Sequence, residues 1–120
     1  DNENSLIIRL RNGKHQILLT GDIGSKTEEK MLPHLESFTV VQAPHHGSKR
    51  SSSAEFVKQT SPEFVVLQAG IGNRYGHPHP STILRWGAKK VLRTDQDGTV
   101  IFQSDGFHAH LKTEFNEPVW

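Results

Sequence analysis

The sequence predicts an α/β fold with a mixed β-sheet, and three observations support this fold class. Short apolar runs, such as Phe64-Val65-Val66-Leu67, alternate with more polar segments of helical length. Asn12-Gly13 stands between two apolar runs, which is typical of a tight β-hairpin. Pro80 and Gly87 bracket a segment as the first turn and the end of a helix. The 120 residues are enough for one domain.

Each element is predicted from its apolar pattern and its flanking turn residues. Thr27 is predicted to cap the first helix, and Glu28 and Glu29 favour the positive end of its dipole. Pro33 shortens or kinks that helix near its end, and Gln96-Asp97-Gly98 is predicted to be a turn. The predicted strands cover residues 6–10, 17–20, 38–43, 64–67, 91–93, 100–102 and 107–111, and the predicted helices cover residues 25–35, 54–59 and 80–86.

Composition excludes several classes of protein. No run of about 20 apolar residues could span a membrane, and no basic-then-apolar signal segment opens the chain. The absence of cysteine excludes disulfides, thiolate zinc sites and cysteine nucleophiles. Eight histidines instead direct attention to metal or acid–base chemistry. Because residue 1 is Asp and a strand begins soon after it, we expect the chain to be part of a longer polypeptide.

The net charge of +1 conceals an asymmetry. Residues 38–94 carry eight basic and two acidic side chains, whereas the acidic residues concentrate toward both ends. A cationic middle suits an anionic partner such as a phosphodiester backbone. The alternative is a solvated surface on which the fold brings the opposite charges together.

Three successive predicted strands each end in a residue that can bind a metal ion. Asp22 follows the second strand, His45-His46 the third, and the loop with His77 and His79 the fourth. Sites in such sheets gather at the loops beyond the strand ends. A carboxylate and imidazoles at one edge can bind zinc, manganese or iron, and the metal would lower the pKa of water and produce a hydroxide nucleophile.

Each of these residues also has a purely structural interpretation. An Asp after Gly at a strand end is commonly a turn former or a helix cap. Adjacent residues of a strand point in opposite directions, so only one of His45 and His46 would face a given ion. The His77-Pro78-His79 segment could be a rigid turn with local hydrogen bonds.

Together, four motifs resemble the metallo-β-lactamase-like domain of the ComEC family of DNA-internalization competence proteins. They are Leu19-Thr20-Gly21-Asp22, Pro44-His45-His46-Gly47-Ser48, Asn73-Arg74-Tyr75-Gly76-His77-Pro78-His79-Pro80, and Arg93-Thr94-Asp95 with Gly98. The resemblance covers about residues 4–105. Their combination in this order is specific, whereas each motif alone would be weak.

The resemblance implies that residues 1–120 are the C-terminal half of an αββα metallo-β-lactamase-like sandwich, with a mixed sheet and helices on one face. The His-x-His-x-Asp-His ligand cluster of the superfamily's first half is absent from this sequence. Asp22 corresponds to the bridging carboxylate and His45 to the later histidine ligand, with His46 as the alternative. His77 and His79 correspond to catalytic residues near the metal, for substrate binding or proton transfer.

The resemblance further implies a hydrolase in a membrane protein of natural competence. Its domain would be a nuclease that uses Zn or Mn to degrade the DNA strand that is not imported, on the outer face of the cytoplasmic membrane. The substrate-binding residues would be Ser48, Lys49, Arg50, Asn73, Arg74 and Tyr75.

The expected partners are single-stranded DNA, the missing half-domain and the membrane channel of the same polypeptide. Alone, the fragment should be weak or inactive and should tend to self-associate. The alternatives are a soluble hydrolase of the same superfamily that acts on another substrate, and a DNA-binding module without catalysis.

Overall fold

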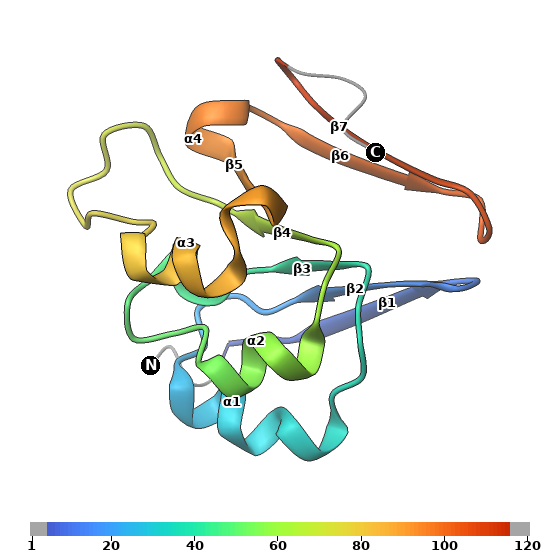
Figure 1. Ribbon diagram of the computed structural model, residues 1–120, viewed down its shortest axis with the longest axis horizontal. Helices are drawn as coiled ribbons and strands as arrows, with labels where there is room; N and C mark the ends of the chain where they lie inside the picture. The colour runs from blue at the N-terminus through green and yellow to red at the C-terminus, as the bar shows by residue number, and fades with distance from the viewer. Residues whose placement is uncertain (1–4, 116–120) are drawn as a thin grey trace.

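The computed structural model describes residues 5–115, and a mixed five-stranded sheet organises them (Figure 1). The strands are β1 (Ile8–Asn12), β2 (His15–Leu19), β3 (Val40–Gln42), β4 (Phe64–Leu67) and β5 (Val91–Arg93). They lie side by side in sequence order, with β1 antiparallel to β2 and the remaining neighbours parallel. The predicted α/β class with a mixed sheet is therefore confirmed.

Three helices pack on one face of this sheet, as Figure 1 shows: α1 (Ser25–Met31), α2 (Ala54–Thr60) and α3 (Pro80–Trp86). Between them and the sheet lies the larger core cluster, in which Val41, Phe56 and Val65 are fully buried. Phe56 of α2 and Trp86 of α3 meet edge to face with ring centroids 6.2 Å apart. The short turns at Leu32–His34 and Ala88–Lys90 are 3₁₀ helices, whereas the turn at Pro44–Gly47 contains residues with left-handed backbone angles.

The opposite face is partly covered by a second, two-stranded sheet. After the single helical turn α4 (Thr94–Asp97), strands β6 (Val100–Ser104) and β7 (Ala109–Thr113) pair with each other and not with the main sheet. Leu111 of β7 packs with Val40 and Leu92 in a smaller core cluster. The last predicted strand therefore does not extend the main sheet, and the predicted turn at residues 96–98 is the end of α4.

The observed helix ends agree with the predicted ones at some positions and differ at others. The helix Pro80–Trp86 has its predicted bounds, and Ser53 caps α2, because its Oγ accepts the Phe56 N–H. The cap predicted at Thr27 is wrong. Helix α1 begins at Ser25, and the Glu28 N–H already donates to the Gly24 carbonyl, so Thr27 lies inside the helix.

The hairpin is confirmed, but its turn lies one residue later than predicted. Asn12 pairs with His15, which leaves Gly13 and Lys14 as the connecting residues. Gly13 has a φ of 61°, and a Cβ there would lie 2.1 Å from the Gly106 carbonyl oxygen. The close approach of the β6–β7 turn therefore requires glycine at this position. Within the described part of the chain, every helix is too short or too polar to cross a membrane.

Candidate functional site

The carboxyl ends of the parallel strands bring the predicted site residues to one edge of the sheet. Asp22 follows β2, His45 and His46 follow β3, and the loop that carries His77 follows β4. Two backbone hydrogen bonds join these segments: the His45 N–H donates to the Gly21 carbonyl, and the His79 N–H donates to the Gly47 carbonyl, each at 2.9 Å. The convergence expected from the parallel topology is therefore present.

The Pro44–Gly47 turn gives the two histidines an uncommon backbone. His45 and His46 have φ values of 52° and 54°, and Gly47 continues the left-handed run with a φ of 79°. His45 and His46 lie beyond the strand, which has already ended at Gln42, so the alternation of strand residues does not set the directions of their side chains. Their rings instead lie at 63° to each other with centroids 6.4 Å apart.

Asp22 and His46 form the central pair of the site. His46 Nε2 lies 3.2 Å from Asp22 Oδ1, and both side chains are about half exposed. The Nδ1–H of His46 donates to the Gln68 carbonyl at 2.8 Å. This hydrogen bond fixes the tautomer, so a neutral His46 presents its Nε2 lone pair to the carboxylate. Either a proton or a cation must lie between two such acceptors.

The distance between His46 Nε2 and Asp22 Oδ1 fits either a shared proton or a bound cation. Two ligands bound at about 2.0–2.2 Å to one ion lie roughly 3.0–3.4 Å apart, which includes the separation of Nε2 and Oδ1. A histidine ligand also commonly donates its other N–H to a backbone carbonyl, as His46 does. Within residues 5–115, however, no three His, Asp or Glu side chains are placed to hold an ion together. The pair would thus supply part of a ligand set.

His77 adds a third imidazole ring to the cluster. Its ring lies 5.7 Å from the His45 ring and 6.4 Å from the His46 ring, measured between centroids. Burial lowers the pKa of His77, and the positive charges of protonated His45 and His46 lower it further. His77 is therefore biased toward the neutral imidazole, the form that binds a metal or accepts a proton.

His79 has a structural role in the same loop. Its Nδ1 accepts the Ser81 N–H at 3.2 Å and so caps α3. Because Nδ1 uses its lone pair in this way, the ring proton lies on Nε2. That nitrogen is a donor, which suits an anionic group and not a metal ion.

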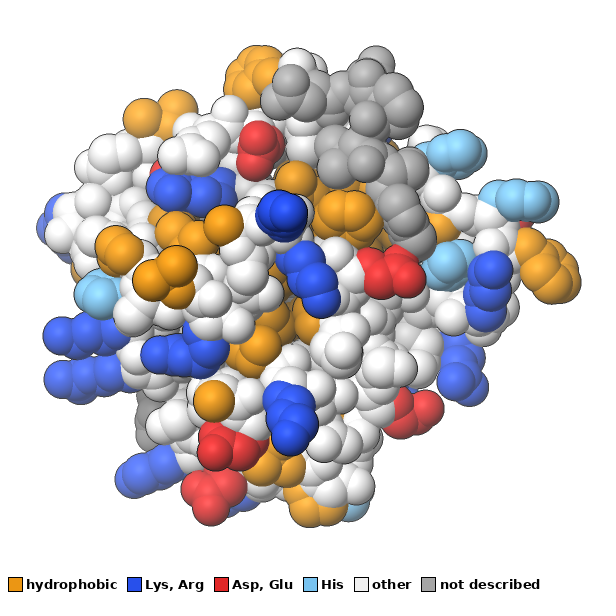
Figure 2. Space-filling view, viewed as in Figure 1, with side chains coloured by type: hydrophobic (Ala, Val, Ile, Leu, Met, Phe, Trp, Pro, Cys, Tyr) orange, Lys and Arg blue, Asp and Glu red, His pale blue; other side chains and the backbone are white. Residues whose placement is uncertain are grey.

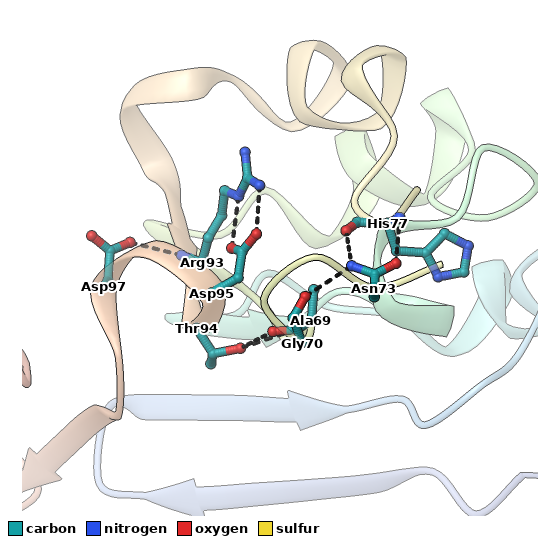
Figure 3. A network of polar contacts seen from close by, with 8 residues as sticks. All are labelled: Ala69, Gly70, Asn73, His77, Arg93, Thr94, Asp95 and Asp97. Carbon is teal, nitrogen blue, oxygen red and sulfur yellow. Dashed lines mark hydrogen bonds and ion pairs between the residues drawn. The ribbon is translucent and has the colours of Figure 1, made fainter. Parts of the chain in front are cut away.

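Asn73 orders the loop between β4 and α3 (Figure 3). Its side-chain amide donates to the His77 carbonyl at 2.6 Å and to the Gly70 carbonyl at 3.0 Å, while its oxygen accepts the His77 N–H. The start of this loop is joined to α4, because Thr94 and Ala69 exchange two hydrogen bonds. Asn73 thus positions His77, and its polar groups are largely used within the loop.

Four of the predicted substrate-binding residues line a small cationic pocket of about 210 Å³, whereas Asn73 and Arg74 do not: the four are Ser48, Lys49, Arg50 and Tyr75. Lys49 and Arg50 line it with His77 and His79, and no acidic side chain does. Basic side chains gather along the left margin of Figure 2, the side on which Figure 1 draws the β4–α3 loop. Ser48 also lines the pocket, but it is buried, and its Oγ accepts the Arg50 N–H. Its role is to hold the loop.

The crowded surroundings of Gly47 lead to a prediction about the stability of the protein. A Cβ at residue 47 would lie 2.6 Å from Pro78 Cβ and 2.9 Å from Leu67 Cδ2. With the positive φ and the overpacking, we expect Gly47→Ala to destabilise the fold by about 2–4 kcal/mol, measured by urea denaturation. Gly70→Ala is the matched control, since no atom lies within 4 Å of its Cβ position. Equal stability of the two variants would contradict this account.

A row of polar side chains that the sequence did not predict crosses the ends of three strands. Gln42 accepts the Thr20 N–H at 3.1 Å and donates to the Gln68 side chain, and the Gln68 carbonyl orients His46. The available signal was positional, because Gln42 is the last residue of β3 and Gln68 directly follows β4. Residues at these positions lie beside the site whatever their type.

Comparison with known proteins gives three informative relatives. The chain is 36% identical over 107 residues to "ComE operon protein 3" of Bacillus subtilis, a match that covers 85% of this chain and 14% of the relative. It is 38% identical over 108 residues to "Competence protein ComA" of Neisseria gonorrhoeae, covering 85% and 16%. It is 36% identical over 85 residues to "Recombination protein 2" of Haemophilus influenzae, covering 71% and 11%. No protein-family model matches the chain.

The chain therefore spans only a small part of the length of these curated relatives, less than a fifth in each case. The three matches nevertheless agree, each covering more than two thirds of this chain at similar identity. The resemblance carried by the four motifs is thus confirmed, and the chain belongs to the family of ComEC-related competence proteins.

Proposed function

We propose that this chain acts in DNA uptake as part of a metal-dependent phosphodiesterase that degrades one DNA strand. The names of the relatives support the role in competence. The main support for the chemistry is the Asp22–His46 pair, whose Nε2 and Oδ1 atoms are 3.2 Å apart with the His46 tautomer fixed by Gln68. In this proposal the fold is half of a metallo-β-lactamase-like sandwich, and the other half supplies the remaining ligands.

In the proposed site, Asp22 and His46 hold a zinc or manganese ion, with His45 close by. Bound there, the ion would supply hydroxide near neutral pH by lowering the pKa of water. Residues of this chain would bind the substrate and move the proton. Lys49 and Arg50 bind the phosphates beside the Nε2–H of His79, and neutral His77 exchanges a proton at the reacting group.

The remaining parts of the proposal concern the surroundings of the domain. We place it on the outer face of the cytoplasmic membrane, where incoming DNA arrives, next to the channel of the same polypeptide. The missing half-domain would complete the ligand set, and without it the chain is weakly active and prone to self-association.

Metal titration and DNA cleavage test the proposal. We expect the purified chain to bind Mn²⁺ or Zn²⁺ in calorimetry and to cleave labelled single-stranded DNA slowly. Cleavage should rise when the chain is joined to the first half of its domain, and EDTA should abolish it. Salt-dependent DNA binding without metal uptake would contradict the proposal and favour the non-catalytic module. Rapid cleavage by the isolated chain would contradict the need for a second half.

A further inference from the structure

An exposed aromatic side chain stands at the entrance to the site. Tyr75 lies in the loop between β4 and α3 and is 67% exposed. Large exposed aromatic rings at the edge of a polar site commonly contact a ligand. The hydrogen bonds of Asn73 hold the loop on both sides of Tyr75, at Gly70 and at His77. The ring is therefore presented by an ordered loop.

The Tyr75 ring begins a row of nearly parallel rings that leads inward. It stacks against His77 at 28° with centroids 5.8 Å apart, and His77 lies at 21° to His46 with centroids 6.4 Å apart. His46 in turn contacts Asp22. A flat group that stacks on Tyr75 would therefore lie in line with the pair proposed to bind the metal ion.

Tyr75 and His77 also separate two pockets of different character. On one side is the cationic pocket lined by Lys49, Arg50 and His79. On the other side is a larger pocket of about 480 Å³, lined by uncharged groups that include Gln68, Asn73 and Thr94 together with His46. The two rings line both pockets. A ligand bound across them would place an anionic group on one side and an uncharged polar group on the other.

A nucleotide has these two parts. We propose that Tyr75 is a stacking platform for an unpaired nucleobase in the larger pocket, while the adjoining phosphate lies in the cationic pocket. The proposal rests on the function proposed above and specifies its substrate as single-stranded nucleic acid. A paired base is already stacked within its duplex and cannot lie on the Tyr75 ring, whereas every unpaired base has a face that can.

Arg74 is placed to contact the same nucleotide. Its guanidinium carbon lies 5.1 Å from the centre of the Tyr75 ring, and its Nη2 donates to the Tyr75 hydroxyl at 3.0 Å. Arg74 is exposed, so it can leave the ring to a base and turn to the phosphate. Stacking of this kind tolerates any base, so the site should show little sequence preference.

Fluorescence anisotropy in EDTA tests the inference without any catalytic turnover. The probes are a labelled ten-nucleotide single strand, its duplex, and the same strand with abasic positions. We expect Tyr75→Ala to weaken binding of the single strand at least about fivefold and to change binding of the duplex and the abasic strand less than twofold. Tyr75→Phe, which keeps the ring, should bind as the unmodified chain does. Circular dichroism verifies that both variants fold.

Each result decides the question. Equal loss for all three probes, or no loss for the single strand, would overturn the stacking role, as would failure of the unmodified chain to bind the single strand. A parallel assay with Mn²⁺, on the chain joined to the first half of its domain, tests cleavage separately. Selective binding without any cleavage would overturn the proposed hydrolase and leave Tyr75 as the base platform. Cleavage together with unchanged binding by Tyr75→Ala would support the proposed hydrolase and overturn the stacking role of Tyr75.

Discussion

Replacing Asp22 by Ala should reduce the affinity for Mn²⁺ at least about 100-fold and abolish metal-dependent DNA cleavage. Even residues that only orient a metal ligand cost 10–100-fold when removed, and Asp22 is proposed to bind the ion directly. His46→Ala should have a similar effect, because it removes the Nε2 atom that lies 3.2 Å from the carboxylate. Calorimetric titration and a gel-based cleavage assay measure the two losses.

The double variant and a surface histidine serve as controls. Because Asp22 and His46 would bind one ion, the double variant should lose little more than either single variant. His34→Ala removes an exposed imidazole from the 3₁₀ turn that follows α1 and should change neither measurement. If Asp22 and His46 instead form only an ion pair, their half-exposed position limits its contribution to the free energy of unfolding to about 0–1 kcal/mol. Unchanged metal affinity in Asp22→Ala would then follow.

Replacing Glu28 by Ala should destabilise the protein by about 2–4 kcal/mol at pH 7. Glu28 is fully buried, and its carboxylate accepts the N–H groups of Ser52 and Ser53 at 2.6 and 2.8 Å. The variant leaves these two donors without their acceptor, and each buried unsatisfied group costs about 1–3 kcal/mol. Urea denaturation measures the loss. Glu29→Ala, next to it on the exposed side of α1, should change stability by less than about 0.5 kcal/mol.

The effect of Glu28 should also depend on pH. Burial raises the pKa of Glu28 above its ordinary 4.5, against the opposing effect of the two backbone N–H groups. Between the ordinary and the raised pKa, the folded protein binds more protons than the unfolded chain, so the contribution of Glu28 to stability falls as the pH rises. The stability difference between the unmodified chain and Glu28→Gln should therefore shrink above pH 4.5. A difference that grows with pH would contradict burial as the dominant cause.

The sequence predicted the fold best where a residue constrains its own backbone. Pro80 and Gly87 delimit α3 at its observed bounds, and Gly13 forms the hairpin turn. Glu28 lies in the first helical turn as predicted, but its burial was not predictable, because its hydrogen-bond partners lie 24 and 25 residues away in the chain. A favourable position in the first turn of a helix does not reveal that a distant loop will bury the carboxylate.

The site was predictable in its membership but not in its geometry. The parallel topology already predicted that Asp22, the His45-His46 pair and the loop with His77 and His79 would meet at one edge, since each follows a strand of the same sheet. The resemblance favoured His45 as the ligand, whereas His46 is the histidine that contacts Asp22. Which histidine would contact Asp22 depends on the φ angles of His45 and His46, and both are left-handed. Left-handed φ angles are uncommon outside glycine, so the sequence left open which of His45 and His46 faces Asp22. The local hydrogen bonds considered as the alternative for the His77-Pro78-His79 turn are present at His79, whose Nδ1 accepts the Ser81 N–H.

The consecutive left-handed residues at His45, His46 and Gly47 have a consequence for protein engineering. A side chain in this region costs roughly 1–2 kcal/mol per residue relative to glycine. A procedure that selects only for thermal robustness would thus replace both imidazoles by glycine, and in doing so would erase the group that faces Asp22. At these two positions the most stable sequence therefore differs from the sequence that places an imidazole beside the carboxylate.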